Sequence, residues 1–362
     1  MNDNRVFIVR TTTDCNLDCS YCYVDHQNPK IIAWNTVAEL HHQCADLDEE
    51  NIVFVWHGGE PLLMGLEFFK KIIDLQNRIE KNFTNAVQTN GIALTNPYIE
   101  LMNLHNIRIS VSLDLPPKQH DFHRTTKKNH AESFYLVENA IARLKKHSCA
   151  VALLSVVADT NADPNEYCDF IRDSEIDSLA LNLEFGLAQK QNATDAARFS
   201  ALQEALYNYS YHGQTSFHFR EAEAIIEHIR HLPVSYCWHR EEFCGYDHHA
   251  IDESGNVYIC CDKFIDAGIS GSKLGNIHRT RLPDILSGNR FQEFMGRLAE
   301  KRAGCASHCK IGAFCRGGCI FDVLKSPGRN GDRKSQVGCM ARANLYSVIA
   351  GDFGVERLGD VC

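Results

Sequence analysis

Apolar segments that favour strands alternate, through the first half of the chain, with segments whose apolar residues have helical spacing. Six segments predict strands, because β-branched and apolar residues run together or alternate with polar ones. They cover residues 5–13, 51–56, 85–89, 107–113, 150–157 and 178–184. Helical patterns separate them, at residues 34–46, 65–80, 96 onward, 133–145 and 164–173. This order predicts parallel β/α units, and right-handed crossovers would curl them into part of a barrel.

Polar or glycine-rich motifs follow four of these predicted strands. They are the loop from Cys15 to Cys22, the turn from Gly58 to Pro61, the turn from Gln88 to Gly91 and the segment from Ser112 to Asp114. The carboxyl ends of parallel strands meet at one edge of an α/β fold, where ligands bind. The pattern therefore predicts one active site built from four motifs.

The second half of the chain has a different character. Residues 193–231 are mostly helical in pattern, and cysteines then crowd the chain from Cys237 to Cys339. A complete eight-fold barrel would need two more β/α units before this cysteine-rich part, and the pattern does not provide them. We therefore predict a partial (β/α)6 barrel with bridging helices over residues 1–231 and a cysteine-rich domain over residues 232–362.

Composition places the chain among ordinary globular proteins. Of its 362 residues, 44% are hydrophobic and 23% are charged. No apolar run approaches the ~20 residues that span a bilayer, and the N-terminus has no apolar segment typical of a secretion signal. We expect a cytoplasmic protein without a membrane partner. The net charge of −9 argues against a nucleic-acid partner.

Cysteine is the unusual component. Sixteen cysteines are many for the cytosol, where thiols stay reduced and structural disulfides are rare, so we expect metals to use them. Residues 290–334 hold four of these cysteines together with ten Lys and Arg against four Asp and Glu. This basic segment is either a solvated surface or a set of cations that offsets the charge of thiolate clusters.

Three cysteines lie within eight residues, as Cys15-Asn-Leu-Asp-Cys19-Ser-Tyr-Cys22. A structural zinc site takes four ligands, and a four-iron cluster usually takes four thiolates. With three local thiolates, one iron of a cluster would stay open for a substrate or cofactor. A zinc site or buried free thiols are the alternatives.

The CxxxCxxC spacing, with Tyr21 at the aromatic position, resembles the signature of the radical S-adenosylmethionine (SAM) enzymes. The resemblance implies a [4Fe-4S] cluster held by Cys15, Cys19 and Cys22, whose open iron chelates SAM. It also implies reductive cleavage of SAM to a 5′-deoxyadenosyl radical. An external reductant such as flavodoxin or ferredoxin would supply the electron.

The strand-end motifs also resemble those of this family, in its branch of sulfatase-maturing enzymes and ribosomal-peptide maturases. The motifs are WHGGEPLL, QTNG, SLD followed by HDxxR, and Ser133-Phe134. Leu115 stands where that branch usually has glycine after SLD. We expect glycines to let the backbone approach SAM, and Arg124 to pair with a carboxylate of SAM or substrate. The predicted SAM-binding residues are Tyr21, Gly58, Gly59, Glu60, Pro61, Gln88, Asn90, Ser112, Asp114 and Arg124.

The C-terminal cysteines resemble the SPASM domain of the same branch. Cys244 and Cys260 flank Gly255 in its pattern, and Cys305, Cys309, Cys315 and Cys319 follow, although the first gap holds three residues instead of two. The resemblance implies two auxiliary [4Fe-4S] clusters, three clusters in all. The ligands of the first auxiliary cluster would be Cys237, Cys244, Cys260 and Cys319. Those of the second would be Cys305, Cys309, Cys315 and Cys339. Zinc at either site is the alternative.

Asp262 is the candidate general base. In the sulfatase-maturing branch an aspartate directly follows the equivalent of Cys260, whereas here Cys261 intervenes. A displaced Asp262 is therefore the alternative expectation.

These features predict a radical SAM oxidoreductase that modifies a peptide or protein, most simply by a cross-link in a ribosomally made peptide. The radical would abstract hydrogen from a side chain, and the auxiliary clusters would accept the remaining electron. The predicted fold starts by residue 5, so we expect a separate leader-binding protein or direct docking of the leader. Three alternatives stay open: sulfatase maturation by formylglycine formation, a small-molecule radical SAM dehydrogenase, and a non-enzymatic iron–sulfur or zinc regulator.

Overall fold

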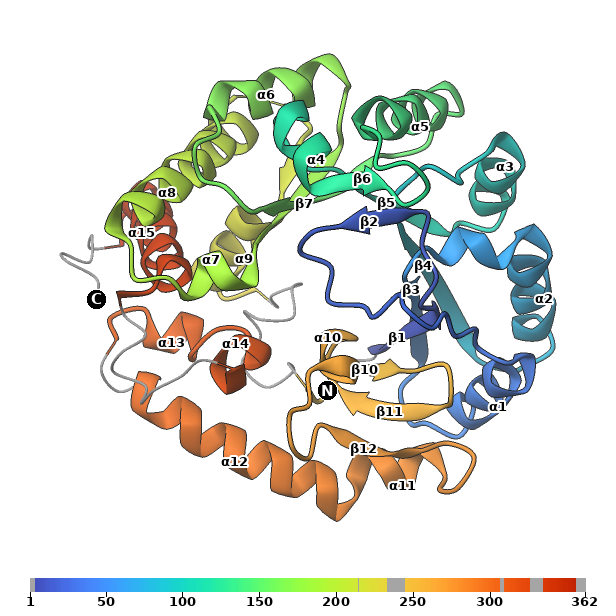
Figure 1. Cartoon of the computed structure of the whole chain (residues 1–362). Helices are drawn as coiled ribbons and strands as arrows, with labels where there is room; N and C mark the ends of the chain where they lie inside the picture. Colours follow the sequence, from blue (N-terminus) through green and yellow to red (C-terminus); the bar gives the residue numbers. More distant parts are fainter. Residues whose placement is uncertain (1–3, 214, 233–244, 307–308, 326–334, 356–362) are drawn as a thin grey trace. The chain divides into compact units, whose positions relative to one another are not determined.

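The computed structural model describes residues 4–213, 215–232, 245–306, 309–325 and 335–355 (Figure 1). The chain forms two compact units, each built from separate segments. The first unit contains Met1–Ser112, Arg124–Ala150 and Phe243–Arg297, and the second contains Leu113–His123, Val151–Glu242 and Leu298–Cys362. The boundary near residue 232 stays a prediction, because residues 233–244 lie outside the described ones.

A mixed sheet forms the centre of the first unit, in the strand order β12-β11-β10-β1-β3-β4-β5. The pairs from β10 through β1, β3 and β4 to β5 are parallel, and β10, β11 and β12 pair antiparallel. Its strands are β1 (Asn4–Thr12), β3 (Asn51–Gly58), β4 (Asn82–Thr89), β5 (Arg108–Ser112), β10 (His248–Ile251), β11 (Asn256–Ile259) and β12 (Lys273–Asn276). The four strands predicted in this part of the chain are therefore present.

Strand β10 pairs with β1 in register Val6 with His248. A hairpin from the cysteine-rich part of the chain thus extends the sheet of the first β/α units. This pairing places the turn between β10 and β11 beside the end of β1, from which the cysteine loop leaves.

Helices of the first unit that lie close to predicted positions are α1 (Trp34–Cys44), α2 (Leu66–Gln76), α3 (Asn96–Leu104) and α5 (Phe134–Lys146). The structure also contains η1 (Pro61–Met64), α10 (Lys263–Asp266) and α11 (Leu282–Ser287), which the pattern did not predict. Helix α12 (Asn289–Ala306) begins in this unit and continues into the second. Within α12 the side chains of residues 304–306 are not described.

Alternation along the strands builds the core. On β3, Ile52, Phe54 and Trp56 have no exposed surface, and they alternate with partly exposed neighbours. His41 packs against Phe54 with ring centroids 4.4 Å apart, while the Trp56 indole donates to Asn85 at 2.9 Å. The buried Trp56 indole is thus hydrogen-bonded, as burial requires.

The second unit has its own parallel strands, β7 (Ala152–Val157), β8 (Ser178–Leu183) and β9 (His218–Phe219). The first two are the remaining predicted strands. Helices surround them: α4 (Pro117–His123), α6 (Pro164–Asp173), α7 (Phe185–Gln189), α8 (Ala193–Tyr207), the π-helical turn η2 (Asn208–His212), α9 (Arg220–Ile229), α13 (Gly312–Cys315), α14 (Ile320–Lys325) and α15 (Val337–Asp352). Residues 193–231 are therefore mostly helical, as predicted.

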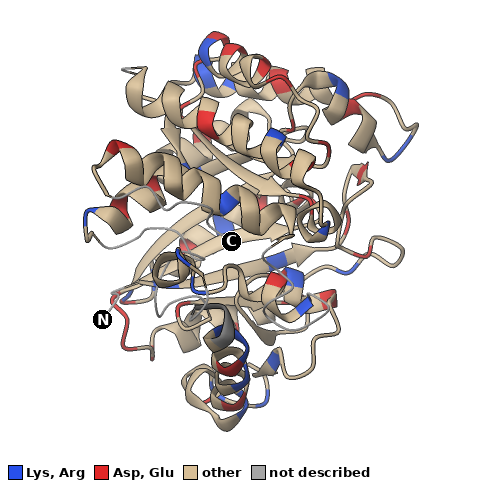
Figure 2. Cartoon of the chain, turned by 90° about the vertical axis from the view of Figure 1, so that its left-hand side faces the viewer, with Lys and Arg blue, Asp and Glu red and all other residues tan. Residues whose placement is uncertain are grey.

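The surface carries charges of both signs, and Lys and Arg positions are interspersed with Asp and Glu on the helices (Figure 2). Among the helices that the structure describes, none is long and apolar enough to cross a membrane. Where Leu115 replaces the expected glycine, the chain turns through a cis peptide bond between Leu115 and Pro116.

Candidate active site

A small two-stranded sheet, absent from the prediction, holds the cysteine loop in place. Strand β2 (Leu17–Cys19) pairs antiparallel with β6 (Arg124–Thr126), which places Cys19 opposite Arg124. Lys127 adds an ion pair to Asp14 at 3.0 Å. These contacts hold the first part of the loop, from Asp14 to Cys19.

Each of the three cysteine sulfurs in this loop lies close to a backbone or side-chain nitrogen. The Leu17 amide donates to Cys15 Sγ at 3.4 Å, and Asn90 Nδ2 lies 3.6 Å from the same sulfur. The nearest guanidinium nitrogen of Arg124 lies 4.0 Å from Cys19 Sγ. His26 Nε2 lies 3.2 Å from Cys22 Sγ.

This donor set fits an iron–sulfur cluster, because hydrogen bonds to the sulfurs stabilise the negative charge of a thiolate cluster. Burial raises the pKa of Cys15 to about 12, so this thiol needs a nearby positive charge to ionise. Cluster iron would supply it. Among the described residues, no three His, Cys, Asp or Glu side chains meet the geometry of a single metal ion.

The paired glycines of the Gly58–Pro61 turn pack against the cysteine loop. A Cβ on Gly58, whose φ is +133°, would lie 2.3 Å from the Thr12 carbonyl oxygen, and one on Gly59 would lie 2.1 Å from that of Asp14. The amide of Gly59 donates to Thr12, and that of Glu60 donates to Asp14, both at 2.8 Å. Glycine at both positions lets the Gly58–Pro61 turn contact the Thr12–Asp14 backbone, and this backbone fills the space that a Cβ would take.

We predict that Gly59→Ala destabilises the protein by about 1–3 kcal/mol, because the added methyl group must displace the Asp14 backbone. Gly296→Ala is the matched control, because a Cβ there meets no atom within 4 Å. Thermal unfolding of the two variants measures the difference. Equal midpoints would contradict the packing role of Gly59.

Glu60 joins two of the strand-end motifs. Its buried carboxylate accepts hydrogen bonds from Thr89 Oγ1 at 2.7 Å and from the Asn90 amide at 2.8 Å. The Leu62 amide donates to it as well, at 3.0 Å. Three of the roughly four acceptor positions of a carboxylate are thus occupied within the protein. Its contact with the amino group of SAM stays a prediction, as does the role of Pro61, the first residue of η1.

The remaining predicted SAM-binding residues are distributed over both units. In the first unit, Gln88 donates to Ser112 Oγ at 2.9 Å, and the Arg124 guanidinium lies 5.4 Å from the centre of the Tyr21 ring. In the second unit, Asp114 is buried and accepts a hydrogen bond from the Val156 amide at 2.8 Å. The structure therefore brings Gln88, Ser112, Tyr21 and Arg124 into one unit, and their contacts with SAM stay predictions.

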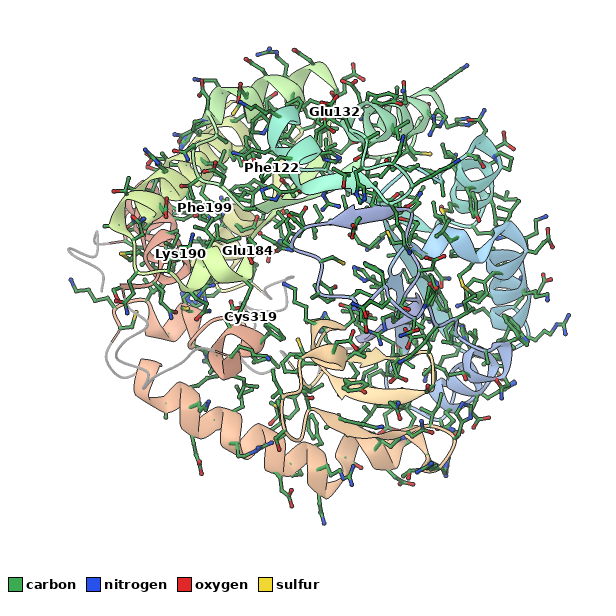
Figure 3. All side chains as sticks on the ribbon, in the orientation of Figure 1. Phe122, Glu132, Glu184, Lys190, Phe199 and Cys319 are labelled. Atoms are coloured by element: carbon green, nitrogen blue, oxygen red, sulfur yellow. The ribbon has the colours of Figure 1, made fainter. Side chains whose placement is uncertain are left out.

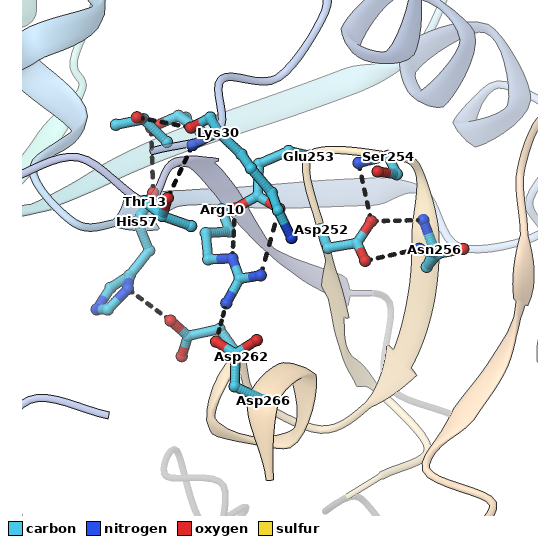
Figure 4. Close-up of polar contacts among 12 residues, drawn as sticks. Arg10, Thr13, Lys30, His57, Asp252, Glu253, Ser254, Asn256, Asp262 and Asp266 are labelled. Atoms are coloured by element: carbon cyan, nitrogen blue, oxygen red, sulfur yellow. Dashed lines mark hydrogen bonds and ion pairs between the residues drawn. The ribbon is translucent and has the colours of Figure 1, made fainter. Parts of the chain in front are cut away.

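Asp262 directly precedes α10 and contacts His57 (Figure 4). The Tyr23 hydroxyl, one residue after Cys22, contacts both of its carboxylate oxygens at 2.9 Å, and His57 Nδ1 lies 2.8 Å from Oδ2. The turn that delivers Asp262 passes through Cys260 in a left-handed conformation, φ +60°, which is uncommon for a residue with a side chain. Asp262 therefore reaches the loop in spite of the inserted Cys261.

Electrostatics keep this carboxylate ionised. Burial favours the neutral acid, yet His57 and the Tyr23 hydroxyl together lower the pKa of Asp262 below its ordinary value. Against the cost of burial, Asp262 in turn raises the pKa of His57. The pair is therefore a buried carboxylate with a stabilised imidazolium. The sequence prediction missed Tyr23 and His57, although both directly adjoin predicted motifs.

A second buried network supports Asp262. Arg10 at the end of β1 forms ion pairs with Glu253 and Asp266 (Figure 4). Arg10 and Glu253 are almost fully buried, so the pair ties β1 to the turn between β10 and β11. Because α10 carries Asp266 and follows Asp262, this network fixes where the candidate base lies.

The predicted auxiliary ligands are only partly described. Cys237 and Cys244 lie outside the described residues, and the side chain of Cys305 is not described either. Cys260 lies in the first unit, whereas Cys309, Cys315, Cys319 and Cys339 lie in the second. Cys319 directly precedes α14 (Figure 3). The assignment of all eight ligands stays a prediction.

Comparisons with known proteins agree with this architecture. Residues 9–171 match the Radical SAM superfamily, and residues 225–310 match SPASM, an iron-sulfur cluster-binding domain. The chain therefore carries a radical SAM domain followed by a SPASM domain. These two domains imply SAM and [4Fe-4S] clusters as cofactors.

Its relatives include sulfatase-maturing enzymes. The serine-type anaerobic sulfatase-maturating enzyme of Bacteroides thetaiotaomicron is 34% identical over 44% of this chain and 41% of its own length. The cysteine-type enzyme of Clostridium perfringens strain 13 is 23% identical over 87% of this chain and 88% of its own. The match thus spans less than half of the first relative and most of the second.

Solved structures share the fold. Native anSMEcpe with bound AdoMet and Kp18Cys peptide has a TM-score of 0.80 at 20% identity, covering 97% of this chain and 98% of its own. Streptococcus suis SuiB bound to precursor peptide SuiA has a TM-score of 0.63 at 16% identity, covering 90% and 74%. The predicted fold, a radical SAM α/β domain with a C-terminal SPASM domain, is therefore confirmed.

Proposed function

We propose that this enzyme oxidises a side chain of a peptide or protein substrate. The observation that carries the proposal is the buried carboxylate of Asp262, held against the cysteine loop by Tyr23 and His57. A peptide oxidation needs a base within reach of the atom that loses hydrogen, and an ionised carboxylate supplies one. The structures of anSMEcpe and SuiB that contain peptides support the choice of a peptide substrate.

In this proposal Cys15, Cys19 and Cys22 hold the cluster that binds SAM. When bound, SAM and this cluster would supply a 5′-deoxyadenosyl radical, which removes one hydrogen atom from the substrate. Asp262 would take a proton from the same side chain, and the remaining electron would pass to an auxiliary cluster. The protein's own task is to orient the reacting groups and to exclude water. Flavodoxin or ferredoxin as reductant and a separate leader-binding protein complete the proposal.

Two products fit this chemistry, and one observation favours each. The printed names of the curated relatives favour formylglycine formation from Cys or Ser in a sulfatase. The inserted Cys261 and the longer gap between Cys305 and Cys309 favour a different substrate, and a cross-link in a ribosomally made peptide is our choice for it.

The test uses the reconstituted enzyme with SAM, a chemical reductant and two peptide sets. One set carries a Cys or Ser within a sulfatase-derived sequence, and the other consists of short precursor peptides encoded beside the gene. Formylglycine reacts with an aldehyde-specific hydrazine, whereas a cross-linked peptide does not. Formation of 5′-deoxyadenosine without modification of any peptide would contradict the proposal.

We predict that Cys339→Ala spares part of SAM cleavage while product formation falls by more than about 100-fold. Losing a residue that only supports a metal ligand typically costs about 10–100-fold, so losing a ligand itself should cost more. The physical reason is that the substrate electron then has no complete path out. The matched control is Cys168→Ala, a half-buried thiol of α6. Unchanged product turnover in Cys339→Ala would contradict the electron-accepting role.

A further inference from the structure

The turn from Cys315 to Cys319 lies between two arginines. It links α13 to α14 in the second unit, with the sequence Cys-Arg-Gly-Gly-Cys. Arg302 from α12 donates to the Gly318 carbonyl at 2.8 Å. Arg342 from α15 approaches the same turn and donates to Cys315 Sγ at 3.4 Å.

The two glycines of this turn make room for the arginines. Gly317 and Gly318 have φ values of +89° and +77°, where glycine is favoured. A Cβ on Gly318 would lie 2.4 Å from Arg342 Nη1, and one on Gly317 would lie 3.3 Å from Arg302 Cγ. Glycine is therefore favoured at both positions by the backbone conformation and by the arginine side chains that lie where a Cβ would point.

Arg342 also acts on a second cysteine. Cys339 precedes it by three residues on α15, which places both residues on neighbouring turns of one helix face. An arginine guanidinium is not deprotonated in proteins, and Arg342 Nη1 lies 3.4 Å from Cys315 Sγ. The guanidinium thus stays charged between two of the four predicted ligands of the second auxiliary cluster.

We propose that Arg342 raises the reduction potential of the auxiliary cluster that is held through Cys315 and Cys339. This inference rests on the proposed function and on its assignment of cluster ligands. It also favours the charge-offsetting interpretation for one residue of the basic segment at residues 290–334, because Arg302 of that segment contacts the same cysteine turn.

The physical reason is the charge balance of reduction. After hydrogen abstraction, the substrate radical loses one electron and one proton to give the oxidised product. The proton goes to a base, and the cluster takes the electron, so that its core charge changes from 2+ to 1+. A fixed positive charge with a hydrogen bond to a ligand sulfur stabilises the more negative, reduced state. Arg342 would therefore make this cluster the better acceptor of the substrate's electron.

The test is a redox titration followed by electron paramagnetic resonance. Proteins with Arg342 and with its variants are compared in a background in which Cys15, Cys19 and Cys22 are changed to Ala. This background lacks the SAM-binding cluster, so the titration reports only the auxiliary clusters. We expect Arg342→Gln to lower the equilibrium constant for reducing one cluster at least tenfold, which is about 59 mV for one electron. Arg342→Lys should keep most of the potential, because it keeps the charge. Arg172→Gln is the matched control, because it removes an exposed arginine of α6 in the same unit, and it should leave both potentials unchanged.

Full iron content with unchanged reduction potentials in Arg342→Gln would overturn the proposed effect of the Arg342 charge. If Arg342→Gln loses one cluster, Arg342→Lys decides: retention of about eight irons supports the charge, and loss of iron there too shows a packing role and overturns it. A background protein that itself holds fewer than two clusters would instead refute the ligand assignment of the proposed function.

Discussion

Cys15→Ala will abolish the formation of 5′-deoxyadenosine. Cys15 is the most enclosed of the three loop thiols, and its sulfur is approached by both the Leu17 amide and Asn90 Nδ2. Losing this ligand leaves two thiolates in the loop, too few to hold a cluster with one open iron. Chromatography of anaerobic reactions with SAM and a chemical reductant measures the product.

Cys149→Ala is the control for this experiment. It removes a half-buried thiol of the same unit, whose sulfur donates to the His147 carbonyl at 3.7 Å. Its rate of SAM cleavage should match that of the wild-type enzyme. An active Cys15→Ala enzyme would show that SAM is cleaved elsewhere, and the proposed site would then be wrong.

Asp262→Asn will separate SAM cleavage from product formation. Asparagine can still accept a hydrogen bond from Tyr23, but it has lost the charge that His57 stabilises and the ability to take a proton. We expect peptide product to fall by about 10²–10⁴-fold, the usual contribution of a general base. Formation of 5′-deoxyadenosine should persist, because the three loop cysteines are untouched.

The matched control makes the same change of charge at the surface. Asp284→Asn alters an exposed residue in the first turn of α11, and product formation should not change. Tyr23→Phe tests the hydrogen bond alone, and we expect a smaller loss than in Asp262→Asn. If Asp262→Asn keeps the wild-type ratio of product to 5′-deoxyadenosine, another group is the base.

Local pattern was enough to predict strands β1, β3, β4, β5, β7 and β8 and the motifs that follow the first four of them. Alternation of buried and exposed residues, as in Ile52, Phe54 and Trp56, is a property of one strand and its own sequence. The cysteine loop and the glycine turn also depend on short spacings. Their approach to each other follows from parallel pairing of β1 with β3, which the β/α order predicts.

Contacts between distant parts of the chain could not be predicted in this way. Asp262 reaches Tyr23 because β10 pairs with β1, and no local pattern indicates a register between residues some 240 positions apart. The strands β2 and β6 have three residues each, too few for any periodicity. The sequence predicts that glycines of the Gly58–Pro61 turn let the backbone approach SAM, and this stays a prediction; the group that lies against Gly58 and Gly59 in the structure is the Thr12–Asp14 backbone.

Iron and acid-labile sulfide analysis of the anaerobically reconstituted enzyme tests the central claim most directly, namely that this chain holds one SAM-binding cluster and two auxiliary clusters. We predict about twelve irons and an equal amount of sulfide per chain. About eight irons should remain when Cys15, Cys19 and Cys22 are changed together to Ala. Zinc without sulfide, or about four irons in the unmodified chain, would contradict the account.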